Sequence, residues 1–166
     1  MKPVKAVCPG SFDPVTLGHL DIIQRASNMF ESVIVLVLNN AAKAPTFSVE
    51  ERVDMLERSI GGLSNVSVDT DDGLLAEYTR LHGARAIVKG LRAVSDFEYE
   101  FQMALINKKL NPEAETVFLT TSAENLYLSS SIVRQIAAMN GDISGFVPAA
   151  VHDDIRKRFA ERSAFE

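Results

Sequence analysis

The chain has 166 residues, of which 46% are hydrophobic and 23% are charged, and its formal net charge is −5. This length and composition predict one globular domain over residues 1–166, the acidic balance disfavours a nucleic-acid binder, and no apolar stretch is long enough to cross a membrane. The single cysteine, Cys8, excludes an intrachain disulfide, and the N-terminus lacks the apolar core of a signal peptide, so we expect a cytoplasmic protein.

Strands and helices are predicted to alternate along the chain. Short apolar runs predict five strands, which cover residues 4–8, 33–38, 66–68, 86–89 and 116–119. Between them, apolar residues recur at helical spacing, as at Leu20 and Ile23, and Ser48 with Glu51 forms a capping box that opens another helix. The last helix is expected at about 149–162. This alternation implies an α/β fold with a parallel five-stranded sheet and helices on both faces, in which ligands bind beyond the carboxyl ends of the strands.

The loop after the first strand carries the first candidate site. It contains neither the dinucleotide-binding pattern G-x-G-x-x-G nor the P-loop pattern G-K-[ST]. It does offer a hydroxyl at Ser11, and Gly18 and His19 open the next helix, whose free N–H groups suit a phosphate. His19 can add a directed N–H donor. The alternative interpretation is that the loop only makes turns and that His19 is an ordinary helix-start residue.

With the first loop, the ends of the fourth and fifth strands make three strand ends that can bind anions, and the loop after the second strand adds a single lysine. Lys43 follows the second strand, and Lys89 and Arg92 flank Gly90 after the fourth. After the fifth strand, residues 129–131 place three serines at a helix start, where capping alone needs only one. Each feature also has an ordinary interpretation, such as a solvated loop lysine at Lys43. Because all of these strand ends meet at one edge of the sheet, they reinforce one another as a phosphate-binding site.

Two motifs at opposite ends of the domain resemble those of the nucleotidyltransferase superfamily. Residues 16–19 (TLGH) are similar to its [HT]-x-G-H motif, and residues 129–134 (SSSIVR) are similar to its serine-rich helix start followed by arginine. Residues 90–92 (GLR) and 96–100 (DFEYE), together with Lys43 two positions before proline, resemble the phosphopantetheine adenylyltransferase family. The resemblance spans essentially the whole chain and implies a Rossmann-like nucleotidyltransferase fold.

This resemblance implies an enzyme that reversibly transfers the adenylyl group of ATP to 4'-phosphopantetheine, giving dephospho-coenzyme A and pyrophosphate. It implies that His19 stabilises the transition state and that Lys43 and Arg92 take part in catalysis. The residues that it assigns to ATP are Ser11, Phe12, His19, Gly90, Leu91, Arg92, Glu100, Asn125, Leu126, Tyr127, Leu128, Ser129, Ser130 and Ser131. Those that it assigns to phosphopantetheine are Ser11, Lys43, Leu75 and Lys89. It also implies a homohexamer.

The proposed chemistry needs no general base, because the attacking phosphate oxygen is largely ionised at neutral pH. Catalysis then consists of holding two polyanions in line and neutralising the charge that grows in the transition state. We expect His19, Lys43, Lys89 and Arg92 to supply positive groups together with helix N-termini. Mg²⁺ is expected as a cofactor held mainly by triphosphate oxygens and water, because the sequence shows no metal-binding cluster.

Two other functions compete with this interpretation. Another small nucleotidyltransferase, acting on a mononucleotide or on glycerol phosphate, would share both superfamily motifs, and the blocks at 90–92 and 96–100 disfavour it. A non-catalytic nucleotide-sensing module would bind ATP without turnover, and His19 and the loop cations would then have no catalytic role.

Overall fold

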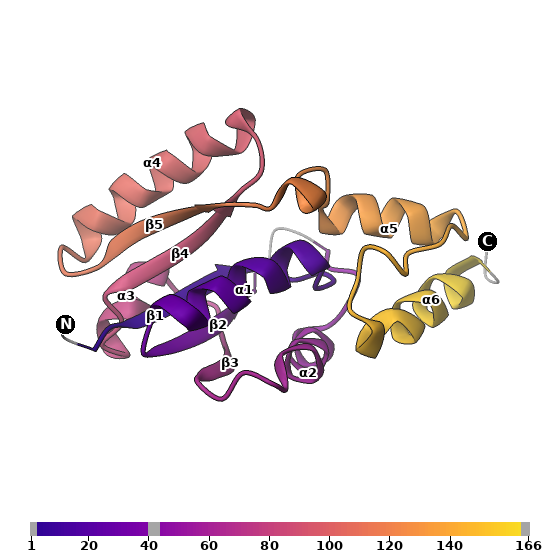
Figure 1. Ribbon diagram of the computed structural model, residues 1–166, viewed down its shortest axis with the longest axis horizontal. Helices are drawn as coiled ribbons and strands as arrows, with labels where there is room; N and C mark the ends of the chain where they lie inside the picture. The colour runs from indigo at the N-terminus through magenta and orange to yellow at the C-terminus, as the bar shows by residue number, and fades with distance from the viewer. Residues whose placement is uncertain (1–2, 40–43, 164–166) are drawn as a thin grey trace.

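The computed structural model describes residues 3–39 and 44–163. Over these residues the strands form one parallel five-stranded sheet in the order β3-β2-β1-β4-β5, which confirms the predicted fold class (Figure 1). The elements are β1 (Lys5–Gly10), α1 (Leu17–Met29), β2 (Ser32–Leu38), α2 (Val49–Ile60), β3 (Val66–Asp71), α3 (Leu75–Leu81), β4 (Ala86–Leu91), α4 (Val94–Leu110), β5 (Glu115–Thr120), the 3-10 turn η1 (Ala123–Asn125), α5 (Ser130–Ala138) and α6 (Ala149–Ser163).

The position of each strand in the sheet explains its sequence. β1 and β2 lie inside the sheet and are covered on both faces, so their apolar runs are nearly continuous. β3 lies at an edge and runs to Asp71, three residues beyond the predicted end at Val68. The second half of β3 is polar, so a search for apolar runs does not find it. This half still pairs with β2, and the last pair is Leu38 with Asp71.

Alternate residues of β1 face two different sets of helices. Ala6 and Cys8 join a buried cluster with residues of α1, whereas Val7 joins another cluster that includes Tyr78 of α3. Helices α1 and α2 pack on β2, and α2 also packs on β3, whereas α4 packs on α3, β4 and β5. The helices therefore cover both faces, as a doubly covered parallel sheet requires.

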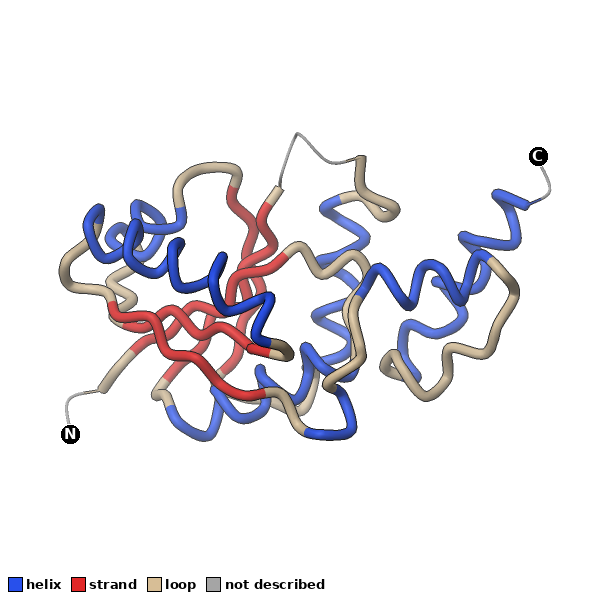
Figure 2. The backbone as a smooth tube through the Cα atoms, turned by 90° about the horizontal axis from the view of Figure 1, so that it is seen from above, coloured by secondary structure: helices blue, strands red, loops and turns tan. Residues whose placement is uncertain are grey.

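Helices α5 and α6 extend the molecule beyond the carboxyl ends of the strands (Figures 1 and 2). α6 packs against both α2 and α5, and Val151 and Ile155 of α6 are fully buried in the largest core cluster. α6 lies where the sequence predicts the last helix, at about 149–162. Among the described residues, no helix has the length and apolar character needed to cross a membrane.

Candidate active site

A cavity of about 1030 Å³ opens at the carboxyl end of the sheet. The β1–α1 loop, the end of β4 and the start of α5 contribute to its wall, so it includes the point where β1 and β4 are neighbours. At this point the chain order of the strands reverses, which is where open α/β sheets bind ligands. The sequence-predicted residues that line it are Ser11, Phe12, His19, Lys89, Gly90, Arg92, Glu100, Leu128, Ser129, Ser130 and Ser131.

His19 is held by a hydrogen-bonded turn at the start of α1. Thr16 is the N-cap of this helix, and its side chain accepts a hydrogen bond of 3.3 Å from the His19 N–H. The Thr16 N–H in turn donates to Nδ1 of the His19 ring at 3.0 Å. Because Nδ1 acts as an acceptor, the neutral ring carries its proton on Nε2. This arrangement leaves Nε2–H as a donor of fixed orientation.

The surroundings of His19 disfavour the charged form of its ring. Burial, with further contributions from the cations Arg92 and Lys89, lowers the pKa of His19 to about 4. The imidazole by itself is therefore neutral at pH 7. A positive charge on His19 beside bound phosphates stays a prediction. A neutral Nε2–H can still donate a hydrogen bond to a phosphate oxygen.

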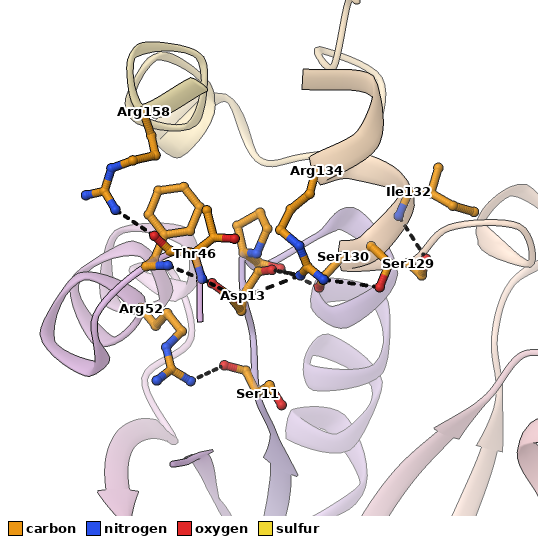
Figure 3. Close-up of polar contacts among 12 residues, drawn as sticks. Ser11, Asp13, Thr46, Arg52, Ser129, Ser130, Ile132, Arg134 and Arg158 are labelled. Atoms are coloured by element: carbon orange, nitrogen blue, oxygen red, sulfur yellow. Dashed lines mark hydrogen bonds and ion pairs between the residues drawn. The ribbon is translucent and has the colours of Figure 1, made fainter. Parts of the chain in front are cut away.

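The β1–α1 loop is fastened from two sides (Figure 3). On one side, the carboxylate of Asp13 accepts hydrogen bonds of 2.9 Å from the N–H groups of both Thr46 and Phe47. On the other, Arg134 of α5 donates to the Asp13 carbonyl oxygen, and its guanidinium lies 3.6 Å from the Asp13 carboxylate. Buried Arg52 of α2 donates to the Ser11 carbonyl oxygen at 2.9 Å. The backbone of the loop is thus fixed before any ligand arrives.

Phe12 fills the space that Gly10 leaves open. Its ring is 4% exposed and lies edge-on to the His19 ring, with the ring centres 5.0 Å apart. A Cβ atom on Gly10 would lie 3.0 Å from the Phe12 ring, so a side chain there would displace it. Phe12 itself has a φ of 49°, in the left-handed region. Little of the ring is left exposed for ATP, and the assignment of Phe12 to ATP stays a prediction.

Two cations of the cavity are held by carboxylates of α4. Nζ of Lys89 lies 3.2 Å from a carboxylate oxygen of Glu100, although the resemblance assigns these two residues to different substrates. Nε of Arg92 donates to Asp96 at 3.2 Å, and its Nη1 donates to the Leu128 carbonyl oxygen at 3.0 Å. These pairs position the cations at the cavity wall, where a polyanion can compete for them.

The three serines at the start of α5 have separate partners. Ser129 is the N-cap, and its hydroxyl accepts from the Ile132 N–H at 3.2 Å. Ser130 donates to the Pro14 carbonyl oxygen at 2.7 Å, and Ser131 accepts from Arg134 at 3.3 Å. Only one serine caps the helix. Ser130 ties α5 to the β1–α1 loop, and the contact of Ser131 with Arg134 lies within α5. The N–H groups of a first helical turn have no partner within the helix, so this helix start can receive a phosphate.

Other predicted site residues do not line the cavity. Leu91, Asn125, Leu126 and Tyr127 are absent from its described lining, and the Tyr127 ring meets Phe146 edge-on at 6.2 Å. Leu75 also does not line it and packs beside the cluster that contains Tyr78. Lys43 lies outside the described residues.

Sequence reasoning missed several residues that shape the site. Asp13, Thr16 and Arg52 all line the cavity and fix the loop, but none was assigned a role. The Thr16–His19 pair is a capping box in which histidine replaces the usual glutamate or glutamine, so the ordinary pattern does not find it. Cys8 also lines the cavity, but burial raises the pKa of its thiol to about 12, so it remains a protonated core residue.

Comparisons with known proteins show the class to which this chain belongs. The model of the cytidylyltransferase-like family matches residues 7–136. A solved structure assigned as a nicotinate-nucleotide adenylyltransferase from Vibrio parahaemolyticus has a TM-score of 0.67 over 92% of this chain and 98% of that one. At 18% identity, that likeness shows the fold alone. The fold and the strand-end site therefore define a protein of the cytidylyltransferase-like class.

Curated relatives narrow the class further. A phosphopantetheine adenylyltransferase from Caldanaerobacter subterraneus subsp. tengcongensis is 56% identical over 93% of this chain and 96% of its own length. Another from Heliobacterium modesticaldum is 51% identical over 94% of this chain and 93% of its own. The chain belongs to the phosphopantetheine adenylyltransferase family.

Proposed function

We propose that this protein transfers the adenylyl group of ATP to 4'-phosphopantetheine, giving dephospho-coenzyme A and pyrophosphate. The observation that carries the proposal is identity above 50% to phosphopantetheine adenylyltransferases over more than 90% of the chain. The nicotinate-nucleotide neighbour shares only 18% identity, so it gives no comparable support to a mononucleotide as the acceptor.

The reaction is a direct displacement at the α-phosphorus of ATP. A phosphate oxygen of phosphopantetheine forms the new bond to this phosphorus, the bond to the β-phosphate oxygen breaks, and pyrophosphate leaves. The nucleophile is already ionised near neutral pH, so the site needs no general base. This fits a cavity in which the one histidine among the described lining residues has its Nδ1 occupied by a backbone N–H.

Electrostatic stabilisation is the main task of the site. Among the described lining residues, four are cationic and three are acidic, and each of the three acids lies against one of the cations. We assign the α-phosphate to the neutral Nε2–H of His19, because a preorganised donor can follow the charge that grows in the transition state. We assign the β- and γ-phosphates to Arg92 and the start of α5, and the acceptor phosphate to Lys89.

Mg²⁺ belongs to this proposal as the counter-ion of the substrate ATP. The described residues contain no group of three or more histidine, cysteine, aspartate or glutamate side chains that could hold a metal. Of the carboxylates that line the cavity, Asp13 is bonded by two backbone N–H groups, and Asp96 and Glu100 are paired with Arg92 and Lys89. These residues do not fit a resident metal site, so the triphosphate and water are left to hold the ion.

Pyrophosphate release tests the proposal. We would incubate the protein with ATP and Mg²⁺, alone and with 4'-phosphopantetheine, nicotinamide mononucleotide or glycerol 3-phosphate. Release with phosphopantetheine alone is the expected result. Release with one of the other acceptors would show a nucleotidyltransferase with a different acceptor substrate. ATP binding without pyrophosphate release under any condition would instead support a non-catalytic nucleotide-sensing module.

The homohexamer, which the family resemblance implies, and the cytoplasmic location, which features of the sequence indicate, stay predictions. Self-association is supported by the exposed apolar side chains of Phe97, Phe101 and Leu105 along α4, because large exposed apolar patches usually mark interaction surfaces. We expect neither a nucleic acid nor a membrane as a partner.

A further inference from the structure

We infer that Arg158 of the C-terminal helix is a positioning residue for the adenylyl transfer, acting through the loop that carries Asp13. This inference rests on the proposed function for its kinetic part. Arg158 lies on α6, beyond residues 7–136 that the cytidylyltransferase-like family model matches. It does not line the cavity, so any effect on the reaction must pass through other residues.

The guanidinium of Arg158 makes three contacts around the N-terminus of α2. Its Nη1 donates to the Thr46 carbonyl oxygen at 2.6 Å, and its Nη2 pairs with Glu51. The guanidinium carbon lies 4.9 Å from the centre of the Phe47 ring, which is 1% exposed. Figure 3 shows Arg158 reaching Thr46 from α6. One side chain therefore fixes Thr46, Phe47 and the first turn of α2 together.

From there, two routes lead to the catalytic loop. In the first, the N–H groups of Thr46 and Phe47 both donate to the Asp13 carboxylate. The Phe47 N–H belongs to the same peptide group as the Thr46 carbonyl that Arg158 bonds. In the second, Glu51 accepts from Arg158 with one oxygen and from the Ser48 N–H with the other, at 2.7 Å. This closes the capping box of α2.

The second route continues along α2. Arg52 follows Glu51 directly, and its guanidinium donates to the carbonyl oxygens of Ser48 and Ser11. Both routes thus end on the segment that leads from Ser11 to His19. The peptide before Thr46 reaches the site as well, because Ala44 and Pro45 line the cavity. Small misplacements of such a loop are costly, since a shift of 1 Å can lower a rate about 100-fold.

Arg58 provides a matched control on the same pair of helices. It lies on α2, donates to the Ala150 carbonyl oxygen at 2.6 Å and pairs with Asp154 of α6. Its side chain is 39% exposed, against 29% for Arg158. Removing Arg58 therefore loosens the contact between α2 and α6 without touching Thr46, Phe47 or Glu51.

The test compares Arg158→Ala, Arg158→Lys and Arg58→Ala by amide hydrogen exchange and steady-state kinetics. In Arg158→Ala we expect the Thr46 and Phe47 amides to exchange about 10-fold faster or more, and kcat to fall about 10–100-fold, with the KM for ATP changed less than about three-fold. Arg158→Lys keeps the charge but not the two-armed fork, so its kcat should lie between those of Arg158→Ala and the unsubstituted protein. Arg58→Ala should change neither these amides nor kcat by more than about two-fold.

Several results would overturn the inference. Equal effects of Arg158→Ala and Arg58→Ala on exchange and kcat would show that Arg158 contributes only to the packing of α6 on α2. Faster amide exchange with unchanged kcat would show that the loop does not need this support for the reaction. If the unsubstituted protein releases no pyrophosphate with any acceptor, the proposed function itself fails. In that case only the structural part of the inference, that Arg158 holds the Thr46–Phe47 segment, can be tested. It is supported only if the Thr46 and Phe47 amides exchange faster in Arg158→Ala and not in Arg58→Ala.

Discussion

At the scale of single residues, His19 combines a structural and a chemical role. Its Nδ1 closes the capping box with Thr16, and its Nε2–H is the donor that we assign to the α-phosphate. Replacing His19 with alanine removes both functions together. Glutamine, by contrast, can accept from the N-cap N–H at this third helical position, as glutamate or glutamine does in the ordinary capping box. The two substitutions therefore separate catalysis from helix capping.

We predict that His19→Gln lowers kcat about 10²–10³-fold, the usual cost of removing one preorganised donor to a developing oxyanion. His19→Ala should lower kcat by at least as much and also destabilise the protein, by about 1 kcal/mol for the lost cap. ATP affinity, measured by calorimetry, should change far less than kcat in both variants. A kcat of His19→Gln within a few-fold of the unsubstituted protein would remove His19 from the chemistry.

The lowered pKa of His19 also predicts a dependence of stability on pH. The unfolded chain has the ordinary pKa of 6.5 and the folded protein about 4, so the unfolded state binds more protons between these values. This contribution to stability is fully present above pH 6.5 and is lost as the pH falls towards 4. Between pH 7.5 and pH 5 the loss should be up to ~2 kcal/mol by linkage. Urea titrations should show a smaller loss for His19→Gln, and equal losses would contradict the neutral buried imidazole.

Some residue roles could be predicted from the sequence and others could not. Ser48 with Glu51 follows the usual capping pattern, and the structure confirms it. Asp13 could not be predicted, because its partners Thr46 and Phe47 lie more than 30 positions away and offer only backbone N–H groups. The pairing of Lys89 with Glu100 was missed for a similar reason, since it depends on where β4 and α4 meet in space.

At the scale of elements, Gly90 fixes how closely β4 approaches α1. A Cβ atom at this position would lie 2.8 Å from Cγ1 of Ile22, a distance that real side chains do not tolerate. Ile22 is 8% exposed and belongs to the core cluster beneath α1, so it has little freedom to move. The glycine that lines the cavity is therefore also required for packing between strand and helix.

We predict that Gly90→Ala destabilises the protein by about 1–3 kcal/mol, the usual range for overpacking a core. Ile22→Ala in the same chain should relieve the clash, so the double variant should lose less than the sum of the single losses. Gly62→Ala is the control, because a Cβ there meets nothing within 4 Å. Urea unfolding would measure these free energies. If the losses of Gly90→Ala and Ile22→Ala simply add in the double variant, the added Cβ does not clash with Ile22.

Element types followed from local patterns, whereas several boundaries depended on neighbours. The apolar run of β2 predicted its strand almost residue for residue. β3 extends to Asp71 because β2 offers pairing partners to its polar half, which no local pattern reveals. The turn η1 was not predicted, because three residues without apolar spacing carry too little signal.

At the scale of the whole molecule, α4 carries an apolar stripe that the single chain leaves uncovered. Phe97, Phe101 and Leu105 follow one another at helical spacing, and each is between 41% and 57% exposed. The rings of Phe97 and Phe101 stack with their centres 5.5 Å apart. Such a stripe is typical of a helix that packs against another subunit.

We predict that light scattering gives about six times the chain mass of 18.2 kDa, as the family resemblance implies. Phe101→Asp should shift the protein to smaller species, because a charge would have to be buried in the contact. Gln102→Asp adds the same charge at an exposed polar position of α4 and should leave the mass unchanged. A monomeric unsubstituted protein, or equal effects of both substitutions, would contradict a contact through this stripe.

In the proposed reaction, a phosphate oxygen of phosphopantetheine attacks the α-phosphorus of ATP directly. We would incubate the protein, ATP and Mg²⁺ with phosphopantetheine that carries ¹⁸O at the three non-bridging oxygens of its phosphate. Mass spectrometry would then measure the masses of the products. Direct attack should give dephospho-coenzyme A that retains all three labelled oxygens, together with unlabelled pyrophosphate. Label in the pyrophosphate, or free AMP in place of the conjugate, would contradict it.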